Sequence, residues 1–415
     1  MPRKVPMQEE LALDAVEGVE EKFDPRLRLT LDSEQCDAVY MLSACRVGVI
    51  TGGPGRGKSW CLQAALPLLG RSVALCAPSG KAARRMSELT RHPASTVHKL
   101  LGLRPEIEGA TYHRGNPLPF DVVVVDEAST LDVFLLRQLL DACDVERTRV
   151  FFVGDVDQLP SVGPGAVLSD LIGADAVPVV RLVTMHRSAA ESWVCRMAPE
   201  ILQGRIDLTN CDNFQFIEAD GDLVEQTENA VSYLASKYGR EAVQCIVPMN
   251  VGDYGTKVLN TALQEVINPH GQDVFSAGGA RIRVGDDVVA IVNDYERVVF
   301  NGECGRITGV EDGTIMVDFY DRQVEYDSRG AGENLRLSYA LTVHKMQGSE
   351  IPWVVLALHE SHGPMLSRKL LYTAVTRARV GVVIVGQRSA VLRSVQLEDT
   401  TRRITTLRQR LEASS

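Results

Sequence analysis

Short, uninterrupted apolar runs recur along the chain, separated by amphipathic segments. The run at residues 122–125 consists of four valines in succession. Such a strand fits a sheet that is buried on both faces, which is the usual state of a parallel sheet. The segment at residues 256–268, which ends before Pro269, has the periodicity of a helix that covers such a sheet. The pattern therefore predicts an α/β protein with strands at residues 47–50, 73–76, 122–125, 149–153, 245–249, 353–358 and 382–386.

Two stretches depart from this pattern. Residues 277–334 show alternation and closely spaced turns, including Asn301-Gly302, and this predicts a small antiparallel barrel inserted between the halves of an α/β domain. Residues 103–119 are rich in glycine and proline, and they are long enough only for a hairpin or a projecting loop.

The composition narrows the class of protein. The chain has 415 residues, 45% of them hydrophobic, which is enough for two or three domains with sizeable cores. Its formal net charge of −10 excludes a global basic surface, so any polynucleotide site must be a local groove. The nine cysteines occur singly, which argues against a zinc ribbon, an iron–sulfur site or a disulfide framework. Without a signal peptide or a membrane-spanning apolar run, a cytoplasmic protein is expected.

The strongest motif is T-G-G-P-G-R-G-K-S at residues 51–59, between a predicted strand and a predicted helix. Its spacing matches a phosphate-binding loop, in which backbone N–H groups and a helix N-terminus surround phosphate oxygens. Lys58 is expected to reach the β- and γ-phosphates of ATP, and Ser59 is expected to hold Mg²⁺. A chance glycine turn before a helix is the weaker alternative. The loop residues assigned to the nucleotide are Gly52, Gly53, Pro54, Gly55, Arg56, Gly57, Lys58 and Ser59.

Polar residues that follow the buried strands supply further candidates. Asp126 comes directly after the valine run and could complete the magnesium shell, while Glu127 could orient or deprotonate the attacking water. If that strand stood alone, two solvated turn acids would be the better interpretation. Gln158 follows another strand within reach of a γ-phosphate, and Arg187 is a candidate clamp for transition-state charge.

Two other segments carry weaker signals. Gln35 lies near the start of a predicted helix at residues 31–40, and its amide could match the two-sided edge of adenine. By residue type alone, a surface glutamine is favoured. The turn at Pro78 and Ser79, followed by Lys81, offers free backbone amides and a cation to an anionic strand, although an ordinary solvated helix face would look the same.

In their joint order, these motifs resemble those of superfamily 1 DNA helicases, and within them the RecD-like and Dda-like branch, superfamily 1B. The resemblance covers about residues 31–389. It depends on the phosphate loop, D-E-A-S at 126–129, G-D-V-D-Q-L-P-S-V-G-P-G at 154–165, V-H-K-M-Q-G-S-E at 343–350 and Y-T-A-V-T-R-A-R at 372–379.

The resemblance implies two RecA-like domains, with ATP between them and single-stranded DNA running across both. The implied parts are a leader at 1–28, a first domain at 29–190 with a strand-separating pin at 103–119, a second domain at 191–389 with an SH3-like barrel at 277–334, and a helical tail at 390–415. It makes Gln35 the adenine contact, Gln158 the γ-phosphate sensor, and Arg187 and Arg377 the arginines that neutralise the transition state. Gly348 and Glu350 are assigned to the nucleotide. The residues assigned to DNA are Pro78, Ser79, Lys81, Thr96, His98, Tyr112, Thr342 and His344.

The chain departs from the family pattern at Arg56, where a threonine is usual, and at Asn250, where relatives often carry a basic residue.

The resemblance implies ATP-dependent travel from 5′ to 3′ and action at junctions of single-stranded and duplex DNA. The implied partners are single-stranded-DNA-binding, replication or recombination proteins, and no membrane is implied. An RNA-directed superfamily 1 helicase and a motor subunit that needs partners remain alternatives. A P-loop ATPase unrelated to nucleic acid would leave the second set of motifs unexplained.

Overall fold

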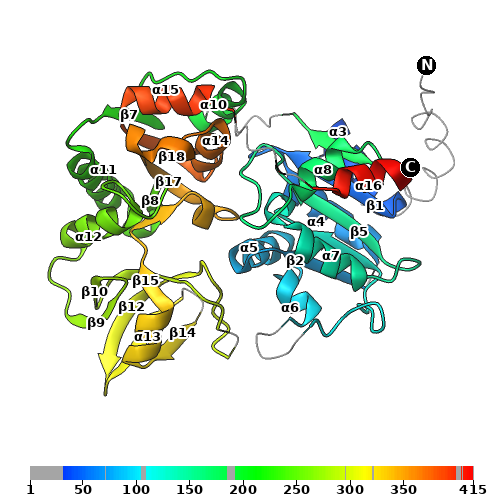
Figure 1. Ribbon diagram of the computed structural model, residues 1–415, viewed down its shortest axis with the longest axis horizontal. Helices are drawn as coiled ribbons and strands as arrows, with labels where there is room; N and C mark the ends of the chain where they lie inside the picture. The colour runs from blue at the N-terminus through cyan, green and yellow to red at the C-terminus, as the bar shows by residue number, and fades with distance from the viewer. Residues whose placement is uncertain are drawn as a thin grey trace.

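Two parallel β-sheets lie side by side in the computed structural model, and a small antiparallel barrel lies below the second sheet in the view of Figure 1. The structure describes residues 31–398, 403 and 405–414, except residues 71, 104–108, 185–191, 295 and 320–321. The predicted α/β class with parallel sheets and an inserted barrel is confirmed. The predicted leader at residues 1–28 and Arg187 lie outside the described residues.

The first sheet has the strand order β3-β2-β4-β5-β1-β6, and every neighbouring pair is parallel. The four valines of β4 are fully buried, as expected for a strand inside a parallel sheet. Because β4, β5 and β1 are neighbours, the residues that follow them meet at one edge of the sheet. The strands are β1 (Val47–Gly52), β2 (Val73–Ala77), β3 (Ala94–Thr96), β4 (Val122–Val125), β5 (Arg149–Gly154) and β6 (Val179–Leu182). The helices are α3 (Ser33–Ala44), α4 (Lys58–Leu69), α5 (Gly80–Thr90), α6 (Val97–Leu101), η1 (Ala128–Thr130), α7 (Val133–Asp141) and α8 (Val167–Gly173).

The second sheet has the order β16-β8-β17-β18-β7 and is parallel throughout. Its central strand β17 is buried from Trp353 to its end, which agrees with the predicted apolar run. The strands are β7 (Phe214–Glu218), β8 (Val243–Val247), β16 (Ala340–Thr342), β17 (Ile351–Leu358) and β18 (Ala378–Gly386). The helices are α10 (Trp193–Leu202), α11 (Leu223–Tyr238), η2 (Arg240–Ala242), α12 (Thr256–Ile267), η3 (His344–Met346), η4 (Glu360–Met365), α14 (Arg368–Val375) and α15 (Arg388–Gln396).

The barrel sheet is antiparallel, with the order β14-β13-β12-β11-β15. Its last strand lies just beyond the predicted insertion at 277–334 and pairs with β11. No helix in the described part of the chain is long and apolar enough to span a membrane. The elements of the barrel are β11 (Asp287–Ala290), β12 (Cys304–Glu311), β13 (Thr314–Asp318), β14 (Gln323–Tyr326), α13 (Ser328–Asn334) and β15 (Leu335–Leu337). Strands β9 (Asp273–Ala277) and β10 (Ala280–Arg283) form a separate antiparallel pair before it.

One predicted strand boundary was wrong. Helix α4, by contrast, ends at Leu69 directly before Gly70, and Pro67 lies inside its last turn. Strand β8 occupies Val243–Val247 instead of 245–249, in register with β16 and β17 on its two sides. For β8, pairing with its two neighbours overrides the local signal.

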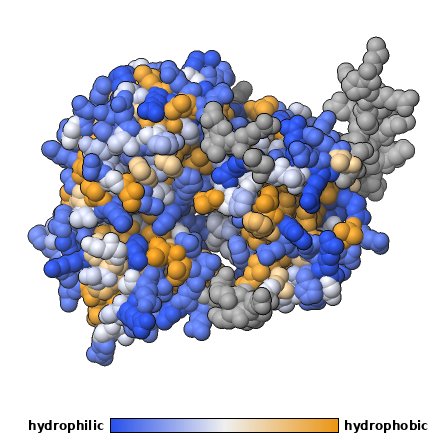
Figure 2. All heavy atoms as spheres, viewed as in Figure 1, coloured by the Kyte–Doolittle hydropathy of each residue, from blue (hydrophilic) through white to orange (hydrophobic). Residues whose placement is uncertain are grey.

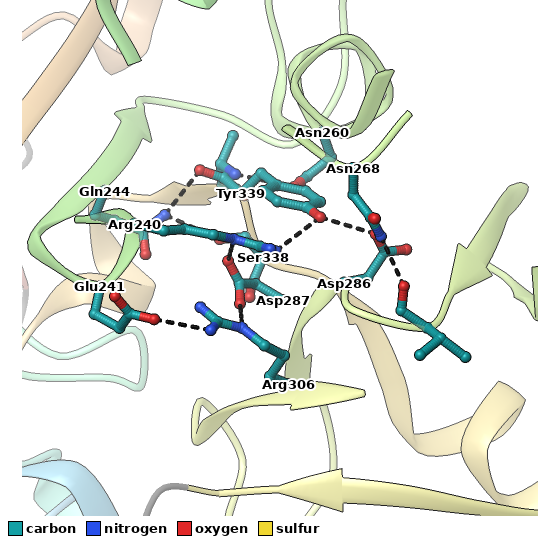
Figure 3. Close-up of polar contacts among 12 residues, drawn as sticks. Arg240, Glu241, Gln244, Asn260, Asn268, Asp286, Asp287, Arg306, Ser338 and Tyr339 are labelled. Carbon is teal, nitrogen blue, oxygen red and sulfur yellow. Dashed lines mark hydrogen bonds and ion pairs between the residues drawn. The ribbon is translucent and has the colours of Figure 1, made fainter. Parts of the chain in front are cut away.

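Two adjacent aspartates join the barrel to the second domain (Figure 3). Asp287 opens β11 and accepts hydrogen bonds from the Nε atoms of Arg240 at 2.6 Å and Arg306 at 2.9 Å. Asp286 is 0% exposed, and its carboxylate accepts four hydrogen bonds. The donors are Gln264 Nε2 at 2.5 Å, Asn268 Nδ2 at 2.7 Å, the Arg283 amide at 2.7 Å and Tyr339 Oη at 2.8 Å. Gln264 and Asn268 belong to the second domain, in α12 and at its C-terminal end. The Asp286 carboxylate therefore holds the barrel against the second domain.

Replacing Asp286 by alanine is expected to lower the free energy of unfolding by about 3–5 kcal/mol, because four buried donors would lose one charged acceptor. Chemical denaturation followed by circular dichroism measures the change. The matched control is Glu311→Ala, which removes an exposed acid of the same barrel and should stay within about 0.5 kcal/mol of the parent. Equal stability of the two variants would contradict an anchoring role for Asp286.

Candidate active site between the two domains

The phosphate loop connects the buried end of β1 to the start of α4. Gly57 has a φ of 85°, a left-handed conformation that favours glycine, and it provides no side chain to cap the helix. The first amides of α4 are therefore available to an anion. Lys58 Nζ donates to the carbonyl oxygens of Gly52 at 2.5 Å and Gly53 at 3.1 Å, which holds the lysine over its own loop. This geometry suits a phosphate chain bound along the loop.

Asp126 and Glu127 follow β4 at the same edge of the sheet. Burial raises the pKa of Asp126 and the neighbouring Glu127 raises it further, whereas Lys58 is among the charges that lower it. Lys58 is therefore close enough to Asp126 to favour the ionised form of its carboxyl group. Glu127 has a φ of 51°, a strained conformation that redirects the chain as it leaves the strand. A Ser59 hydroxyl and one carboxylate are a fitting donor set for Mg²⁺, which binds one or two carboxylates together with substrate phosphates.

The loop at residues 155–165 is held by the second domain. Gln158 is 5% exposed; its Nε2 donates to Asp155 Oδ2 at 3.1 Å, and its Oε1 has no hydrogen-bond partner among the described residues. Tyr372 Oη from the second domain donates to the same Asp155 oxygen at 2.7 Å. The Leu159 amide donates to Thr373 Oγ1 at 2.8 Å. A loop that follows a first-domain strand is thus fastened to α14 of the other domain.

Arg377 approaches from the second domain, just after α14. It is 3% exposed, and its guanidinium donates to the carbonyl oxygens of Thr373 at 3.1 Å and Ser349 at 3.2 Å. Its positive charge lowers the pKa of Tyr372, which burial and Asp155 raise. Arg377 is therefore near the interdomain network that contains Gln158.

A pocket of about 210 Å³ opens between the phosphate loop and the second domain. Tyr372 closes one side, and a Cβ atom at Gly53 would approach its Oη to 3.0 Å. Residues 51–54 and Arg56 form the opposite wall. Sequence patterns gave no indication of several lining residues, because they lie on β6 and α10, which carry no motif. These residues are Arg181, Cys195, Ala198, Pro199 and Leu202.

Three predicted nucleotide contacts lie elsewhere. Gln35 is 1% exposed, so the surface alternative was wrong: its Oε1 accepts from the Asp32 amide and completes the capping box of α3. Gly348 packs against α5, where a Cβ atom would meet Ala82 Cβ at 3.0 Å. Glu350 pairs with Arg85 of α5 at 2.6 Å. These two residues join the domains on the α5 side, and none of the three lines the pocket.

The predicted DNA contacts gather around α5, α6 and η3. Ser79 and Thr96 are N-caps, and their hydroxyl oxygens accept from the amides of Ala82 at 3.3 Å and Lys99 at 3.0 Å. Thr342 likewise accepts from the Lys345 amide. Pro78 precedes the α5 cap and is partly buried.

Three further predicted DNA residues differ in their surroundings. Burial lowers the pKa of both His98 and His344, so each ring is held neutral at neutral pH and offers hydrogen bonds instead of charge. Tyr112 packs against the first-domain core. Within the predicted pin, only residues 103 and 109–119 are described, and His113 and Asn116 exchange backbone hydrogen bonds in a tight turn.

The barrel faces α5 across the gap between the domains. Lys81 Nζ lies 3.2 Å from Cys304 Sγ, and a Cβ atom at Gly80 would meet Phe300 at 3.0 Å. Figure 2 shows a hollow between the two halves of the molecule on a largely hydrophilic face. The barrel and α5 therefore come into contact beside this gap.

A groove of about 470 Å³ runs between the second domain and the barrel. Thr342 lines it, together with three cations that are not among the predicted DNA contacts: Lys257, Arg336 and Lys345. No acidic side chain is among its described lining residues. The three cations come from α12, β15 and η3, so only the tertiary structure brings them together.

A phosphate loop at a cleft between two parallel-sheet domains, with catalytic candidates from both, defines the class of two-domain P-loop proteins. Three family models match: an AAA domain at residues 30–228, an ATP-dependent RecD-like DNA helicase SH3 domain at 259–319, and a UvrD-like helicase C-terminal domain at 337–385. The chain is 31% identical over 430 residues to the RecBCD enzyme subunit RecD of Mycolicibacterium smegmatis, covering 91% of this chain and 74% of that protein. The chain belongs to the RecD-like helicase family.

Other relatives extend this comparison. The ATP-dependent RecD2 DNA helicase of Deinococcus radiodurans is 40% identical over 382 residues, which cover 88% of this chain; the chain spans half the length of that relative. In fold, the chain is similar to a Pif1 helicase solved at forked duplex DNA, with a TM-score of 0.55 at 19% identity over 85% of this chain and 92% of that one. A Bacteroides Pif1 bound to single-stranded DNA gives a TM-score of 0.50, with the same identity and coverage.

Proposed function

We propose that the protein is an ATP-dependent DNA helicase that moves from 5′ to 3′ along single-stranded DNA and separates duplex DNA. One observation carries the proposal: the loop at residues 155–165, which holds Gln158, is hydrogen-bonded to the second domain at both Asp155 and Leu159. A change at the γ-phosphate of ATP would therefore reach the second domain directly. The names of the RecD relatives, one of them an ATP-dependent DNA helicase, support the same conclusion.

The proposed roles follow from position. Lys58 holds the phosphates, Ser59 and Asp126 hold Mg²⁺, and Glu127 orients and deprotonates water. Magnesium, when bound, would neutralise charge on the phosphate oxygens. Gln158 senses the γ-phosphate, and Arg377 and Arg187 neutralise transition-state charge. Gln35 remains our proposed adenine contact, with Gly348 and Glu350 acting through the domain interface.

On the DNA side, the groove cations Lys257, Arg336 and Lys345 would contact phosphates, while His98 and His344 would supply neutral hydrogen bonds. Closure of the cleft on ATP and its reopening after hydrolysis would alternate the grip on the strand. Opening one base pair requires about 1.4 kcal/mol on average, so a small pin at residues 103–119 would suffice to convert movement into unwinding.

The test uses two matched partial duplexes, one with a 5′ and one with a 3′ single-stranded DNA tail, with unwinding and ATP hydrolysis followed together. We expect unwinding of the 5′-tailed duplex alone. Unwinding from the 3′ tail would overturn the polarity. ATP hydrolysis stimulated by single-stranded RNA and not by DNA would favour an RNA-directed helicase, and hydrolysis without unwinding of either duplex would favour a translocase or a motor subunit that needs partners.

A further inference from the structure

The C-terminal segment returns from the second domain to the first. Helix α15 packs on the second domain against α14, whereas α16 (Leu407–Ser414) packs on the first domain against α8. Figure 1 shows α16 beside α8, apart from α15. Leu407 and Leu411 pack against the core cluster of the first domain. We call residue 403 and residues 405–414 the C-terminal strap.

Arg403 connects this strap to the loop that carries Gln158. Its Nη1 donates to the carbonyl oxygens of Gly163 at 2.8 Å and Gly165 at 3.0 Å, and it lies 3.5 Å from Ser161 Oγ. One guanidinium therefore binds the far end of the loop at residues 155–165. Hydrogen bonds from a charged donor are stronger than those between neutral groups, so this contact restrains the loop.

The side chain of Gln158 depends on that restraint. Only its Nε2 is held, by Asp155, which follows β5 in the same loop, while Gln158 Oε1 and Ser129 Oγ are buried without hydrogen-bond partners among the described residues. Gln158 and Ser129 line a cavity of about 520 Å³, and the strap contributes Arg403 and Arg408 to the lining of the same cavity. The position of the sensor is thus set by the backbone of the loop, and Arg403 holds that backbone at its far end.

Arg403 is also close to the predicted DNA path, since its positive charge lowers the pKa of His344. We infer that Arg403 is a positioning residue for ATP hydrolysis: it holds the 155–165 loop so that Gln158 meets the γ-phosphate when the domains close. This inference rests on the proposed function. It assigns a role in ATP hydrolysis to the C-terminal strap, which carries no helicase motif.

The experiment measures DNA-stimulated ATP hydrolysis by the full chain. Arg403→Ala should lower kcat about tenfold, while KM for ATP and the DNA concentration for half-maximal stimulation stay within about twofold. Arg403→Lys, which keeps the charge and the reach, should recover part of the lost kcat. Leu407→Asp, which releases α16 without touching Arg403, should also lower kcat. The matched control, Arg393→Ala, removes an exposed arginine of α15 and should leave kcat unchanged.

Absence of DNA-stimulated ATP hydrolysis in the parent protein would mean that the proposed function has failed. An active parent with an unchanged kcat in Arg403→Ala would overturn the positioning role. So would a lower melting temperature in Arg403→Ala together with no recovery in Arg403→Lys, because that pattern indicates a structural contact only.

Discussion

Replacing Glu127 by glutamine should lower kcat for ATP hydrolysis by about 10³-fold and leave ATP and DNA binding within about twofold of the parent. Glutamine has nearly the shape of glutamate and keeps a polar oxygen, but it cannot accept a proton from water at neutral pH. Asp126 and Lys58, which surround the nucleotide phosphates in our proposal, remain in place. Binding should therefore survive while the chemical step is lost.

The measurement pairs steady-state hydrolysis with equilibrium binding of a fluorescent ATP analogue. Glu146→Gln is the control, because Glu146 is an exposed acid in a turn of the same domain, and its replacement should change neither quantity. Parental turnover in Glu127→Gln would assign the base to another group.

Replacing Arg377 by alanine should lower kcat by about 10³-fold or more, in the range found when a charge-neutralising arginine is removed from a phosphoryl-transfer site. The residue lies in the second domain, so its contribution depends on domain closure. Arg377→Lys should be nearly as impaired, because the guanidinium reaches the Thr373 and Ser349 carbonyls from two different nitrogens, Nε and Nη1, whereas all donors of an ammonium lie on one nitrogen.

Since Arg377 is buried, thermal melting must show that the variants fold. Arg379→Ala is the matched control: the residue lies two positions further along β18 and is exposed, and its loss should leave kcat within about twofold of the parent. A folded Arg377→Ala protein with parental kcat would remove this arginine from the catalytic site. A change confined to KM would make it a ground-state contact.

Local features of the sequence were sufficient for much of the fold and for the first-domain half of the candidate site. The four valines of β4 and the glycines of the phosphate loop act over a few residues, because burial on both faces and left-handed backbone are local demands on residue type. Asp126 directly follows β4, and the phosphate loop that leads to Lys58 follows β1; both strands end at the same edge of a parallel sheet. The closely spaced turns and the alternation at residues 277–334 likewise indicated the antiparallel barrel.

The tertiary structure decided what depends on residues far apart in the chain. Gln35 makes its capping contact with Asp32 locally, but its burial to 1% exposure depends on the rest of the domain packing around it, which its residue type does not predict. The groove brings together Lys257 and Arg336, which lie in no motif, and Lys345, which lies in the motif at 343–350. No periodicity near Arg403 indicates that it would contact Gly163, 240 positions earlier.

Local sequence patterns thus established the class of fold and the phosphate loop and singled out the candidate carboxylates, because backbone geometry and strand burial constrain residue type locally. The anchoring of the barrel by Asp286, the lining of the groove and the attachment of the strap were decided only in three dimensions. The physical reason is that a hydrogen bond or an ion pair needs one suitable partner at the right distance, and many polar residues in the chain could serve as that partner until folding selects one.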